Sequence, residues 1–399
     1  MNERICIIGQ SGGPTAAINA TLAGVIKAAK QAGYQKIYGM LNGIEGFISD
    51  HIIDLMAISD EQSLDMLIHT PAMYLGSCRF KINSADTNLK DLIFNKLNQL
   101  NVTDFFYIGG NDSMDTVQQL SEHAAAIGSA ILFIGIPKTI DNDLAHTYYT
   151  PGYPSACQYV ATTLLEISRD TCIYPEPSVT IVELMGRDAG WLTASAALVN
   201  ENNRQIIDLI YLPEIPFDID DFIVRVKNQL KIKKHLIVAV SEGIKDRQNE
   251  YIAVSAGYQI DPFGNCSRSG CAARLKEWLE PEINCKIRSI ELNILQRCSG
   301  HLANEVDISN AIRFGETAVE FAMAGETGIF VGSTYSKLDG LKFKNVIISE
   351  VSNKVKPFPL EWIDQDTNQI RRNYIDYVMP IISRDCDLPL PKYIINTLN

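Results

Sequence analysis

The segment from Lys138 to Asp143 places one ammonium, one hydroxyl and two carboxylates within six residues. It follows the apolar run 130–134, which is typical of a buried strand that ends at the next glycine and proline. A cation beside carboxylates at a strand end suits phosphoryl transfer. The lysine would hold phosphate oxygens, one Asp would accept a hydroxyl proton and another would orient a metal. An acidic turn without chemistry is the alternative for such a motif taken alone.

A glycine-rich loop at 9–15 provides a second candidate site. Residues 4–8 are predicted to form a strand and 16–32 a helix, with Gly12 and Gly13 between them. Backbone N–H groups of such a loop and the N-terminus of the following helix bind anions. The loop matches neither GxxxxGK[ST] nor GxGxxG, so a P-loop NTPase or an ordinary dinucleotide fold is not supported. A tight turn without a ligand is the alternative.

The sequence GGNDS at 109–113 lies between a predicted strand, 104–108, and a predicted helix, 114–126. Gly110 lets the backbone approach a ligand, while Asn111 and Asp112 project oxygens that suit a hard cation such as Mg²⁺. In the alternative interpretation Asp112 or Ser113 caps the helix. The two roles are compatible, because a helix N-terminus with spare donors also binds anions.

Further polar segments follow the same pattern. The predicted strand 179–184 leads into MGRDAGW and a helix through 199, and the predicted strand 235–240 leads into SEG. Arg79 lies in a polar, glycine-containing segment, 75–80. The strand-like segment 286–297 carries Arg288 and Arg297, whose odd separation predicts opposite faces of a strand. For all three arginines an ordinary surface or ion-pair role is the alternative.

The order of these elements predicts the fold class. Five strands, each followed by a glycine-bearing polar loop, alternate with helices, and such alternation favours parallel sheets whose carboxyl edges hold ligands. The length of 399 residues suggests two or three domains. We therefore expect an α/β protein with two Rossmann-like lobes, largely parallel sheets, and an active site in the cleft between the lobes.

Composition excludes several classes of function. The net charge of −12 argues against binding to nucleic acid or to an anionic membrane surface. The chain shows no signal peptide and no apolar run of membrane-spanning length, so we expect a cytoplasmic protein. Its nine cysteines lack metal-ligand spacing, and reduced thiols are expected. The proline-punctuated tail from Ser349 onward, including 385–391, receives no predicted role.

With these loops identified, the chain resembles the phosphofructokinase family over most of its first 345 residues. GGNDS, PKTIDND, MGRDAGW, SEG and LQR occur in the family's order. ATP-dependent members usually carry Gly where Lys138 stands, and GGDGS where this chain has Asp112 after Asn111. Lys138 and Asp112 therefore resemble the pyrophosphate-dependent branch. Ile44, at the approximate place of an aromatic residue that contacts adenine, points the same way.

The resemblance implies reversible Mg²⁺-dependent transfer of a phosphoryl group from diphosphate to the 1-hydroxyl of fructose 6-phosphate, a glycolytic reaction. It implies that Asp141 is the base, that Thr139 lies beside the transferred group, and that Arg79 and Arg187 stabilise its charge. The implied donor-binding residues are Gly12, Gly13, Gly110, Asn111, Asp112 and Lys138. The implied substrate-binding residues are Thr139, Asp141, Asp143, Met185, Gly186, Arg187, Glu242, Arg288 and Arg297.

Several positions depart from the family pattern. Asn111 replaces the usual metal-site Asp, which leaves Asp112 and Asp143 as candidate ligands of Mg²⁺. Ser178 and Ile294 stand where relatives often carry an Arg and a ring side chain, so the exact sugar phosphate stays open. One sugar-phosphate arginine of the family comes from a neighbouring subunit, which implies a homodimer or homotetramer.

The expected division gives a phosphoryl-donor lobe, residues 1–150 with roughly 296–345, and a sugar-phosphate lobe, residues 151–295 with part of 346–399. Two alternatives remain on the same fold: an ATP-dependent 6-phosphofructokinase and a sugar-phosphate-binding protein without catalysis. A nicotinamide-dependent oxidoreductase shares the alternation of strands and helices, but the chain lacks the dinucleotide fingerprint.

Overall fold

The computed structural model describes residues 3–200, 205–253 and 270–382, and these divide into two compact units. Of the described residues, unit 1 contains 3–155 and 297–356, and unit 2 contains 156–200, 205–253, 270–296 and 357–382. Each unit is therefore assembled from segments that lie far apart in the sequence. The predicted tail segment 385–391 and Cys266 lie outside the described residues.

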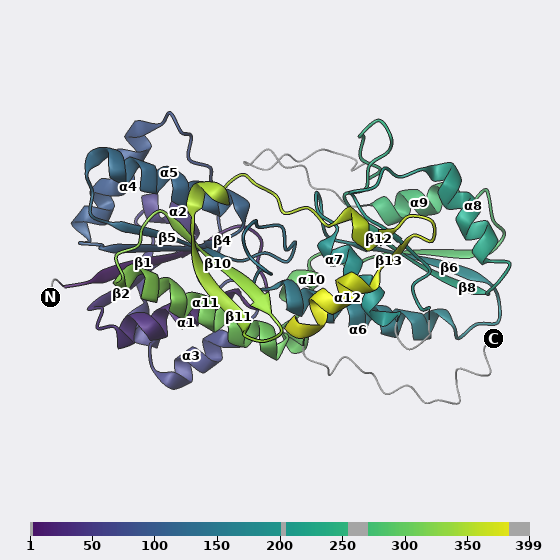
Figure 1. The fold of residues 1–399 in the computed structure, drawn as a ribbon, viewed down its shortest axis with the longest axis horizontal. Coiled ribbons are helices and arrows are strands. Elements are labelled where there is room, and N and C mark those ends of the chain that lie inside the picture. Colours follow the sequence, from purple (N-terminus) through teal and green to yellow (C-terminus); the bar gives the residue numbers. More distant parts are fainter. Residues whose placement is uncertain (1–2, 201–204, 254–269, 383–399) are drawn as a thin grey trace. The chain divides into compact units, whose positions relative to one another are not determined.

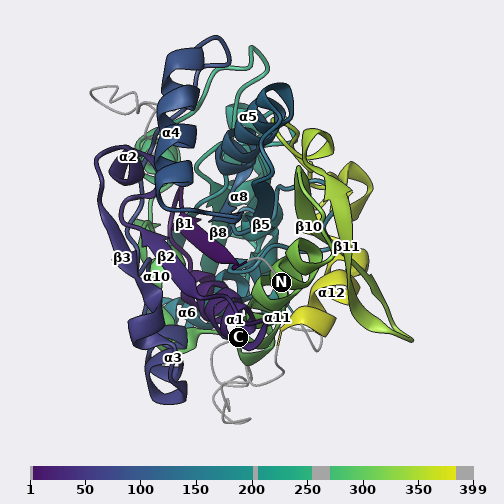
Figure 2. The same cartoon turned by 90° about the vertical axis from the view of Figure 1, so that its left-hand side faces the viewer.

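Unit 1 is built on a seven-stranded sheet with the order β11-β10-β5-β4-β1-β2-β3. The inner strands are parallel to one another, and the two edge strands, β11 and β3, are antiparallel to their neighbours. Figure 2 shows this sheet with β3 toward one side and β11 toward the other. The strands are β1 Ile5–Gln10, β2 Lys36–Met40, β3 Ile52–Asp54, β4 Asp104–Gly109, β5 Leu132–Pro137, β10 Ile329–Ser336 and β11 Gly340–Ile347.

Helices cover both faces of this sheet. In Figure 1, α4 and α5 lie on one face and α1 and α11 on the other. On the α4 face, Phe133 packs against Phe105 and Phe94 with ring centroids 5.1 and 5.6 Å away. The helices of unit 1 are α1 Ile18–Gln31, α2 Gly43–Ile48, α3 Glu61–Ile68, α4 Thr87–Gln99, α5 Asn111–Ile127 and α11 Glu305–Met323, with short 3₁₀ helices at Leu55–Ile58, Gly300–Leu302 and Ile348–Glu350.

Unit 2 contains a four-stranded parallel sheet with the order β7-β8-β6-β9. Its strands are β6 Ser178–Leu184, β7 Leu209–Tyr211, β8 His235–Ser241 and β9 Lys286–Glu291. Helices α8 and α9 cover one face and α6 the other (Figure 1). The remaining elements of unit 2 are α7 Trp191–Ala194, α8 Ile219–Gln229, α9 Cys271–Leu279, β12 Ile363–Asp364, β13 Gln369–Ile370 and α12 Arg372–Val378, with 3₁₀ helices at Ser195–Val199, Leu360–Trp362 and Met379–Ile381. Helices α6 Tyr153–Thr171 and α10 Leu295–Cys298 span the boundary, since α6 begins and α10 ends in unit 1.

The predicted α/β class with largely parallel sheets is confirmed, but the predicted strand at 130–134 is misplaced. β5 begins at Leu132 and continues through Gly135 to Pro137. Gly135 is required inside the strand, because a Cβ there would lie 2.5 Å from Sδ of Met114. Pro137 occupies the last position, where the lost N–H is tolerated. Glycine and proline therefore mark packing and the strand end here, rather than a loop.

The GGNDS segment is also more regular than predicted. α5 begins at Asn111 rather than 114, and Gly110 occupies its N-cap. Gly110 has no side chain, so neither Asp112 nor Ser113 occupies the N-cap position that the alternative interpretation gave them. The N–H groups of Ser113 and Met114 both donate to the carbonyl of Gly110 at 3.1 Å.

The prediction of one strand through 286–297 is wrong. β9 ends at Glu291, and Asn293 adopts a positive φ of 45°, which ends the extended conformation. Arg297 lies on α10 instead. The strand argument for opposite faces therefore does not apply to Arg288 and Arg297.

The described part of the tail belongs to the core of unit 2. An aromatic cluster forms around Trp191, with ring centroids of Phe358, Tyr377 and Trp362 at 5.1, 5.2 and 5.9 Å. Trp191 immediately follows the MGRDAG loop. The tail therefore anchors the helix that begins where this loop ends.

Two further findings concern the hydropathy of the helices and the state of the cysteines. Across residues 3–200, 205–253 and 270–382, no helix combines the length and hydropathy that a membrane span requires. The seven cysteines in these ranges form no disulfide with one another. Burial raises the pKa of the Cys6 and Cys271 thiols well above the usual value, which makes these two thiols inert at neutral pH.

Helices α1 and α11 cross in contact because both carry glycine at the crossing. A Cβ on Gly24 would lie 2.1 Å from the carbonyl oxygen of Ile312. A Cβ on Gly315 would lie 2.2 Å from the carbonyl oxygen of Thr21. Both obstacles are backbone atoms, so a side chain at either position forces the helices apart.

We expect Gly315→Ala to destabilise the protein by about 1–3 kcal/mol through overpacking, although alanine favours the helix itself. Apparent melting temperature and denaturant midpoint measure this loss. Gly300→Ala is the matched control, since the nearest atom to a Cβ there, Cβ of Pro71, lies at an ordinary 3.5 Å. Equal stability of the two variants would contradict the close crossing.

Candidate active site

Lys138 lies at the centre of the candidate site in unit 1. Its backbone N–H donates to the carbonyl of Gly109 at the end of β4, and its Nζ donates to the carbonyl of Gly13 at 2.7 Å. The side chain is 2% exposed. Burial lowers the pKa of Lys138 to about 8, while Asp141 opposes this shift. Lys138 therefore joins the loops that follow β1, β4 and β5.

Other charged groups surround this ammonium. Arg297 lowers the pKa of Lys138 further, whereas Asp143 and Asp112 raise it. Each of these effects requires proximity, because Coulomb interactions weaken with distance. The predicted residues Asp112, Asp141, Asp143 and Arg297 therefore all lie near enough to influence the charge of Lys138, with carboxylates and cations both represented.

The glycine loop brings the backbone against these cations. Gly12 adopts a φ of +81°, and a Cβ there would lie 3.1 Å from Nζ of Lys138. A Cβ on Gly13 would lie 2.8 Å from Nη1 of Arg297. Ser77 Oγ donates to the carbonyl of Gly12 at 2.7 Å, which places the exposed Arg79 two residues beyond this contact. The positive φ favours glycine at 12, and at both positions the absence of a side chain lets a cation lie against the backbone.

Two residues of the predicted glycine loop at 9–15 pack within the protein instead of facing the site. Gly9 and Gln10 belong to β1, and a Cβ on Gly9 would lie 2.5 Å from the ring of Tyr107. Gln10 is buried, donates to Asn19 Oδ1 at 3.0 Å and accepts from the N–H of Leu75 at 3.0 Å. Gly9 and Gln10 therefore hold the start of the loop in place through β1 and its neighbours.

The N-terminus of α5 adjoins Lys138. Gly110 at the N-cap lies beside the backbone of Lys138, with 3.6 Å between a Cβ on Gly110 and the Lys138 carbonyl oxygen. Asp112 lies in the first turn, whereas the amide of Asn111 is engaged elsewhere. Asn111 Nδ2 donates to the carbonyl of Lys354 at 2.8 Å, and Asn111 Oδ1 accepts from the N–H of Asn353 at 2.6 Å. Asn111 thus tethers a distant segment to α5.

Thr139 orients Asp141. Its Oγ1 accepts from the N–H of Asp141 at 3.1 Å and donates to Asp141 Oδ2 at 3.4 Å. Thr150 Oγ1 donates to the carbonyl of Thr139 at 2.7 Å, which holds the turn from the other side. The carboxylate of Asp141 therefore stands at a defined place beside the hydroxyl of Thr139.

Two residues that the sequence analysis missed support this loop. Asn142 is fully buried with a φ of 53°, and its Oδ1 accepts from the N–H of Thr150 and from Nζ of Lys356, at 3.2 and 3.1 Å. Burial lowers the pKa of Lys356 to about 7, opposed by Asp143. Asn142 lies within the PKTIDND motif, between Asp141 and Asp143 (the D-N-D loop), which could have drawn attention to it. No local sequence pattern points to Lys356.

In unit 2 two predicted loops meet at the carboxyl ends of β6 and β8. Gly186 adopts a φ of +134°, and its carbonyl accepts from Ser241 Oγ at 2.5 Å. A Cβ on Gly243 would lie 1.9 Å from the carbonyl oxygen of Arg187. The N–H of Glu242 donates to Leu184 at 2.9 Å. Met185, Gly186 and Arg187 are thereby brought beside Glu242.

Arg288 lies apart from that group within unit 2. It lies midway along the edge strand β9, in register with Thr180, whereas Met185 and Glu242 follow the carboxyl ends of their strands. Arg288 Nη1 forms an ion pair with Asp170 at 3.0 Å. The structure therefore does not bring Arg288 to the edge that carries the other unit 2 residues.

Two buried carboxyls hold the loops of unit 2 and were not predicted. Glu214 accepts from the N–H of Gly190 at 2.8 Å and from that of Phe358 at 3.2 Å, so it joins the end of the MGRDAG loop to the tail. Glu183 accepts from the N–H of Ala272 at 2.8 Å. Burial raises the pKa of Glu183 to about 7. Both contacts fix backbone rather than offer a group to a ligand.

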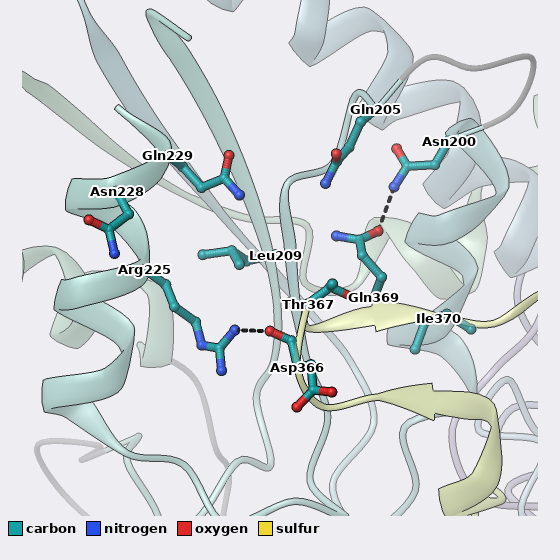
Figure 3. Close-up of a pocket in the computed structure, with 10 residues that line it drawn as sticks. All are labelled: Asn200, Gln205, Leu209, Arg225, Asn228, Gln229, Asp366, Thr367, Gln369 and Ile370. Carbon is teal, nitrogen blue, oxygen red and sulfur yellow. Dashed lines mark hydrogen bonds between the residues drawn. The ribbon is translucent and has the colours of Figure 1, made fainter. Parts of the chain in front are cut away.

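A hollow of about 810 Å³ opens elsewhere in unit 2, beside β7. Figure 3 shows its amide-rich lining, in which Asn200 donates to Gln369 and Arg225 to the carbonyl of Asp366, at 2.9 and 2.5 Å. Gln369 in turn donates to the carbonyl of Asp208 at 2.6 Å. These polar groups hydrogen-bond to one another and to the backbone. They therefore connect β7 to the β12–β13 hairpin instead of offering a set of groups to a ligand.

A magnesium ion in unit 1 would need ligands from the substrate. In the part of the chain that the structure describes, no group of three or more His, Cys, Asp or Glu could hold a metal by itself. Mg²⁺ is commonly bound by one or two carboxylates together with substrate phosphates. Asp112 and Asp143, which both raise the pKa of Lys138, stay the predicted ligands of such a shared ion.

Comparisons with known proteins agree with this geometry. The chain is 35% identical to the pyrophosphate–fructose 6-phosphate 1-phosphotransferase of Rhodospirillum rubrum, over 95% of this chain and 94% of that protein. An ATP-dependent 6-phosphofructokinase of Pectobacterium carotovorum is 29% identical over 91% of this chain and 98% of that protein. The crystal structure of a pyrophosphate-dependent phosphofructokinase from Nitrosospira multiformis superposes with a TM-score of 0.86 at 30% identity, covering 98% and 96% of the two chains. The family model for phosphofructokinase matches residues 4–322, and the chain belongs to that family.

Proposed function

We propose that this protein is a pyrophosphate-dependent 6-phosphofructokinase, which reversibly transfers a phosphoryl group from diphosphate to the 1-hydroxyl of fructose 6-phosphate. The observation that carries the proposal is the buried ammonium of Lys138, held at Gly13 and surrounded by Asp141, Asp143 and Asp112. Relatives that are named for the pyrophosphate reaction match at higher identity than the ATP-dependent relative does.

Donor choice follows from the charges beside the glycine loop. Lys138 adds a cation that diphosphate needs, because this donor has no adenosine to anchor it. Asp112, in the first turn of α5, adds a carboxylate that repels the inner phosphate of a nucleotide. Ile44 is 1% exposed and lies in the core of unit 1, so its support for this donor is weak.

The reaction needs a base and a set of donors for the transferred group. The sugar 1-hydroxyl oxygen attacks the terminal phosphorus of diphosphate, the bond from phosphorus to the bridging oxygen breaks, and phosphate leaves. Asp141 takes the hydroxyl proton, and Thr139 orients Asp141 beside the transferred group. Arg79 and Arg187 stabilise the charge on the equatorial oxygens. The backbone at Gly12, Gly13 and Gly110, with Lys138, holds the donor phosphates.

The sugar phosphate is assigned to a second set of residues. Glu242 binds sugar hydroxyls, Met185 and Gly186 position the sugar, and Arg297 binds the 6-phosphate. Arg288 lies midway along the edge strand β9 and contacts Asp170, so its role fits a sugar phosphate held by a neighbouring subunit. This assignment supports a homodimer or homotetramer.

Mg²⁺ would be held by Asp112 and Asp143, and it would neutralise charge on the phosphates during transfer. Asn111 is not assigned to the metal, because its amide binds the backbone of residues 353 and 354. The enzyme would act in glycolysis in the cytoplasm. The division of labour follows the two units, with donor and base in unit 1 and most sugar contacts in unit 2.

We expect Asp141→Ala to lower turnover by about 10²–10⁴-fold, because the hydroxyl then lacks its base. Coupled assays of fructose 1,6-bisphosphate formation measure the loss, and thermal melting checks the fold. Asp65→Asn, on the exposed face of α3, is the control carboxylate. Near-normal turnover of Asp141→Ala would remove Asp141 from the role of base.

A donor panel tests the choice between diphosphate and ATP. Wild-type protein should turn over with diphosphate and not with ATP. Lys138→Gly should raise the KM for diphosphate and lower kcat, and Lys138→Gly with Asp112→Gly should admit ATP, since both the added cation and the repelling carboxylate are gone. Wild-type turnover with ATP alone would favour the ATP-dependent kinase, and ligand binding without turnover would favour the non-catalytic alternative.

Metal dependence tests the assigned ligands. We expect chelation to abolish turnover and Mg²⁺ to restore it. Asp112→Asn or Asp143→Asn should raise the Mg²⁺ concentration for half-maximal rate by about tenfold or more, as the loss of a metal-site contact commonly does. Unchanged Mg²⁺ dependence in both variants would show that these carboxylates do not carry the ion.

A further inference from the structure

Residues 353–356, called the strap here, run beside the catalytic loop of unit 1. Val355 forms an antiparallel bridge with Leu144, and the N–H of Lys356 donates to the carbonyl of Asp143 at 2.7 Å. Asn353 and Lys354 bond with Asn111 at the start of α5, as described above. Two proposed donor-site segments, the D-N-D loop and the α5 N-terminus, are thus fastened to one strap.

Lys356 provides the densest set of these contacts. Its Nζ donates to Asn142 Oδ1 at 3.1 Å, to the carbonyl of Tyr148 at 3.1 Å and to that of Thr147 at 3.3 Å. Three acceptors match the three donors of an ammonium. All three acceptors follow Asp141 in the chain, so one side chain closes the loop between 142 and 148 onto itself.

The loop has a shape that needs such a brace. Asn142, between the base and the proposed metal ligand, is held at a φ of 53°, a conformation that non-glycine residues seldom adopt. A strained conformation persists only where its surroundings determine it. Asn142 is fully buried, and its Oδ1 receives both Lys356 Nζ and the N–H of Thr150. The left-handed turn sets the directions in which Asp141 and Asp143 leave the backbone.

Placing the Lys356 ammonium among these three acceptors costs free energy of desolvation, which favours a positioning role over simple filling of space. Moving an ammonium out of water is unfavourable unless hydrogen bonds replace those it makes to water. The three acceptors of Lys356 named above are neutral oxygens, one of a side-chain amide and two of the backbone. A hydrophobic residue of similar length would fill the space without that penalty, but it would leave the three oxygens without this donor.

We propose that Lys356 is a positioning residue, which fixes the 141–143 turn so that the base and the metal-binding carboxylate keep their working geometry. The proposal rests on the function proposed above. Lys356 acts through Asn142 and the loop backbone rather than through substrate. Its removal should therefore affect the rate of the chemical step more than the binding of either substrate.

The experiment compares Lys356→Met with Lys354→Met, a matched control on the same strap whose side chain is exposed. We expect kcat of Lys356→Met to fall by about 10²-fold, the loss that a displacement of about 1 Å can cause. KM for diphosphate and fructose 6-phosphate should change less than threefold. Lys356→Arg should recover part of the lost rate, and Lys354→Met should match wild type.

Amide hydrogen exchange provides the readout that is independent of catalysis. In Lys356→Met, exchange should rise at residues 139–150 while the helices α1 and α11 stay protected. If that variant does not fold, Lys356→Gln, which keeps one donor for Asn142, takes its place with the same expectations. Wild-type kcat, or unchanged exchange at 139–150 in the folded variant, would overturn the proposal. A wild-type protein without turnover would refute the proposed function instead, and exchange would still test the brace.

Discussion

The structure of unit 1 depends on one buried ammonium at the meeting point of three strands. Lys138 follows β5, contacts the backbone that follows β1 and lies beside the segment that follows β4. These three strands are neighbours in the sheet, and the glycines at 12 and 13 lie directly against Lys138 Nζ and Arg297 Nη1, while Gly110 lies against the Lys138 backbone. An ammonium removed from water needs acceptors or anions nearby. The carboxylates around it serve that need in the protein, and a phosphate donor would serve it during binding.

The main features of this arrangement could be predicted from sequence because they are local. An apolar run followed by Gly, Lys and Asp marks a strand end, and alternation with helices marks a parallel sheet. What local patterns did not supply was the exact extent of each strand. β5 continues through Gly135 because β4 pairs with it along its full length, and that pairing is a property of the sheet rather than of the segment. The same applies to Arg297, whose place on α10 follows from the turn at Asn293.

The supporting residues could not be predicted because their partners lie far away in the chain. Lys356 and Asn142 are 214 residues apart, and Glu214 and Phe358 are 144 apart. Neither pair has a period, a spacing or a motif that announces it. One residue of each pair, Lys356 or Phe358, lies in the tail from Ser349 onward, for which the sequence predicted no role. The tail therefore contributes to each unit separately, with Lys356 beside the D-N-D loop of unit 1 and Phe358 beside the MGRDAG loop of unit 2.

Lys138 and Lys356 illustrate how one loop of unit 1 combines support with the proposed chemistry. Burial lowers the pKa of both, to about 8 for Lys138 and about 7 for Lys356. The acceptors of Lys356 belong to a turn whose shape they help to fix. The surroundings of Lys138 include three carboxylates and one guanidinium, and their balance changes whenever an anion or a metal arrives. Lys356 donates to three neutral oxygens of the turn, whereas Lys138 donates to one backbone carbonyl, that of Gly13, and its pKa responds to three carboxylates and one guanidinium. In the function proposed above, the loop from 138 to 143 therefore receives its shape from Lys356 and offers Lys138 to the donor.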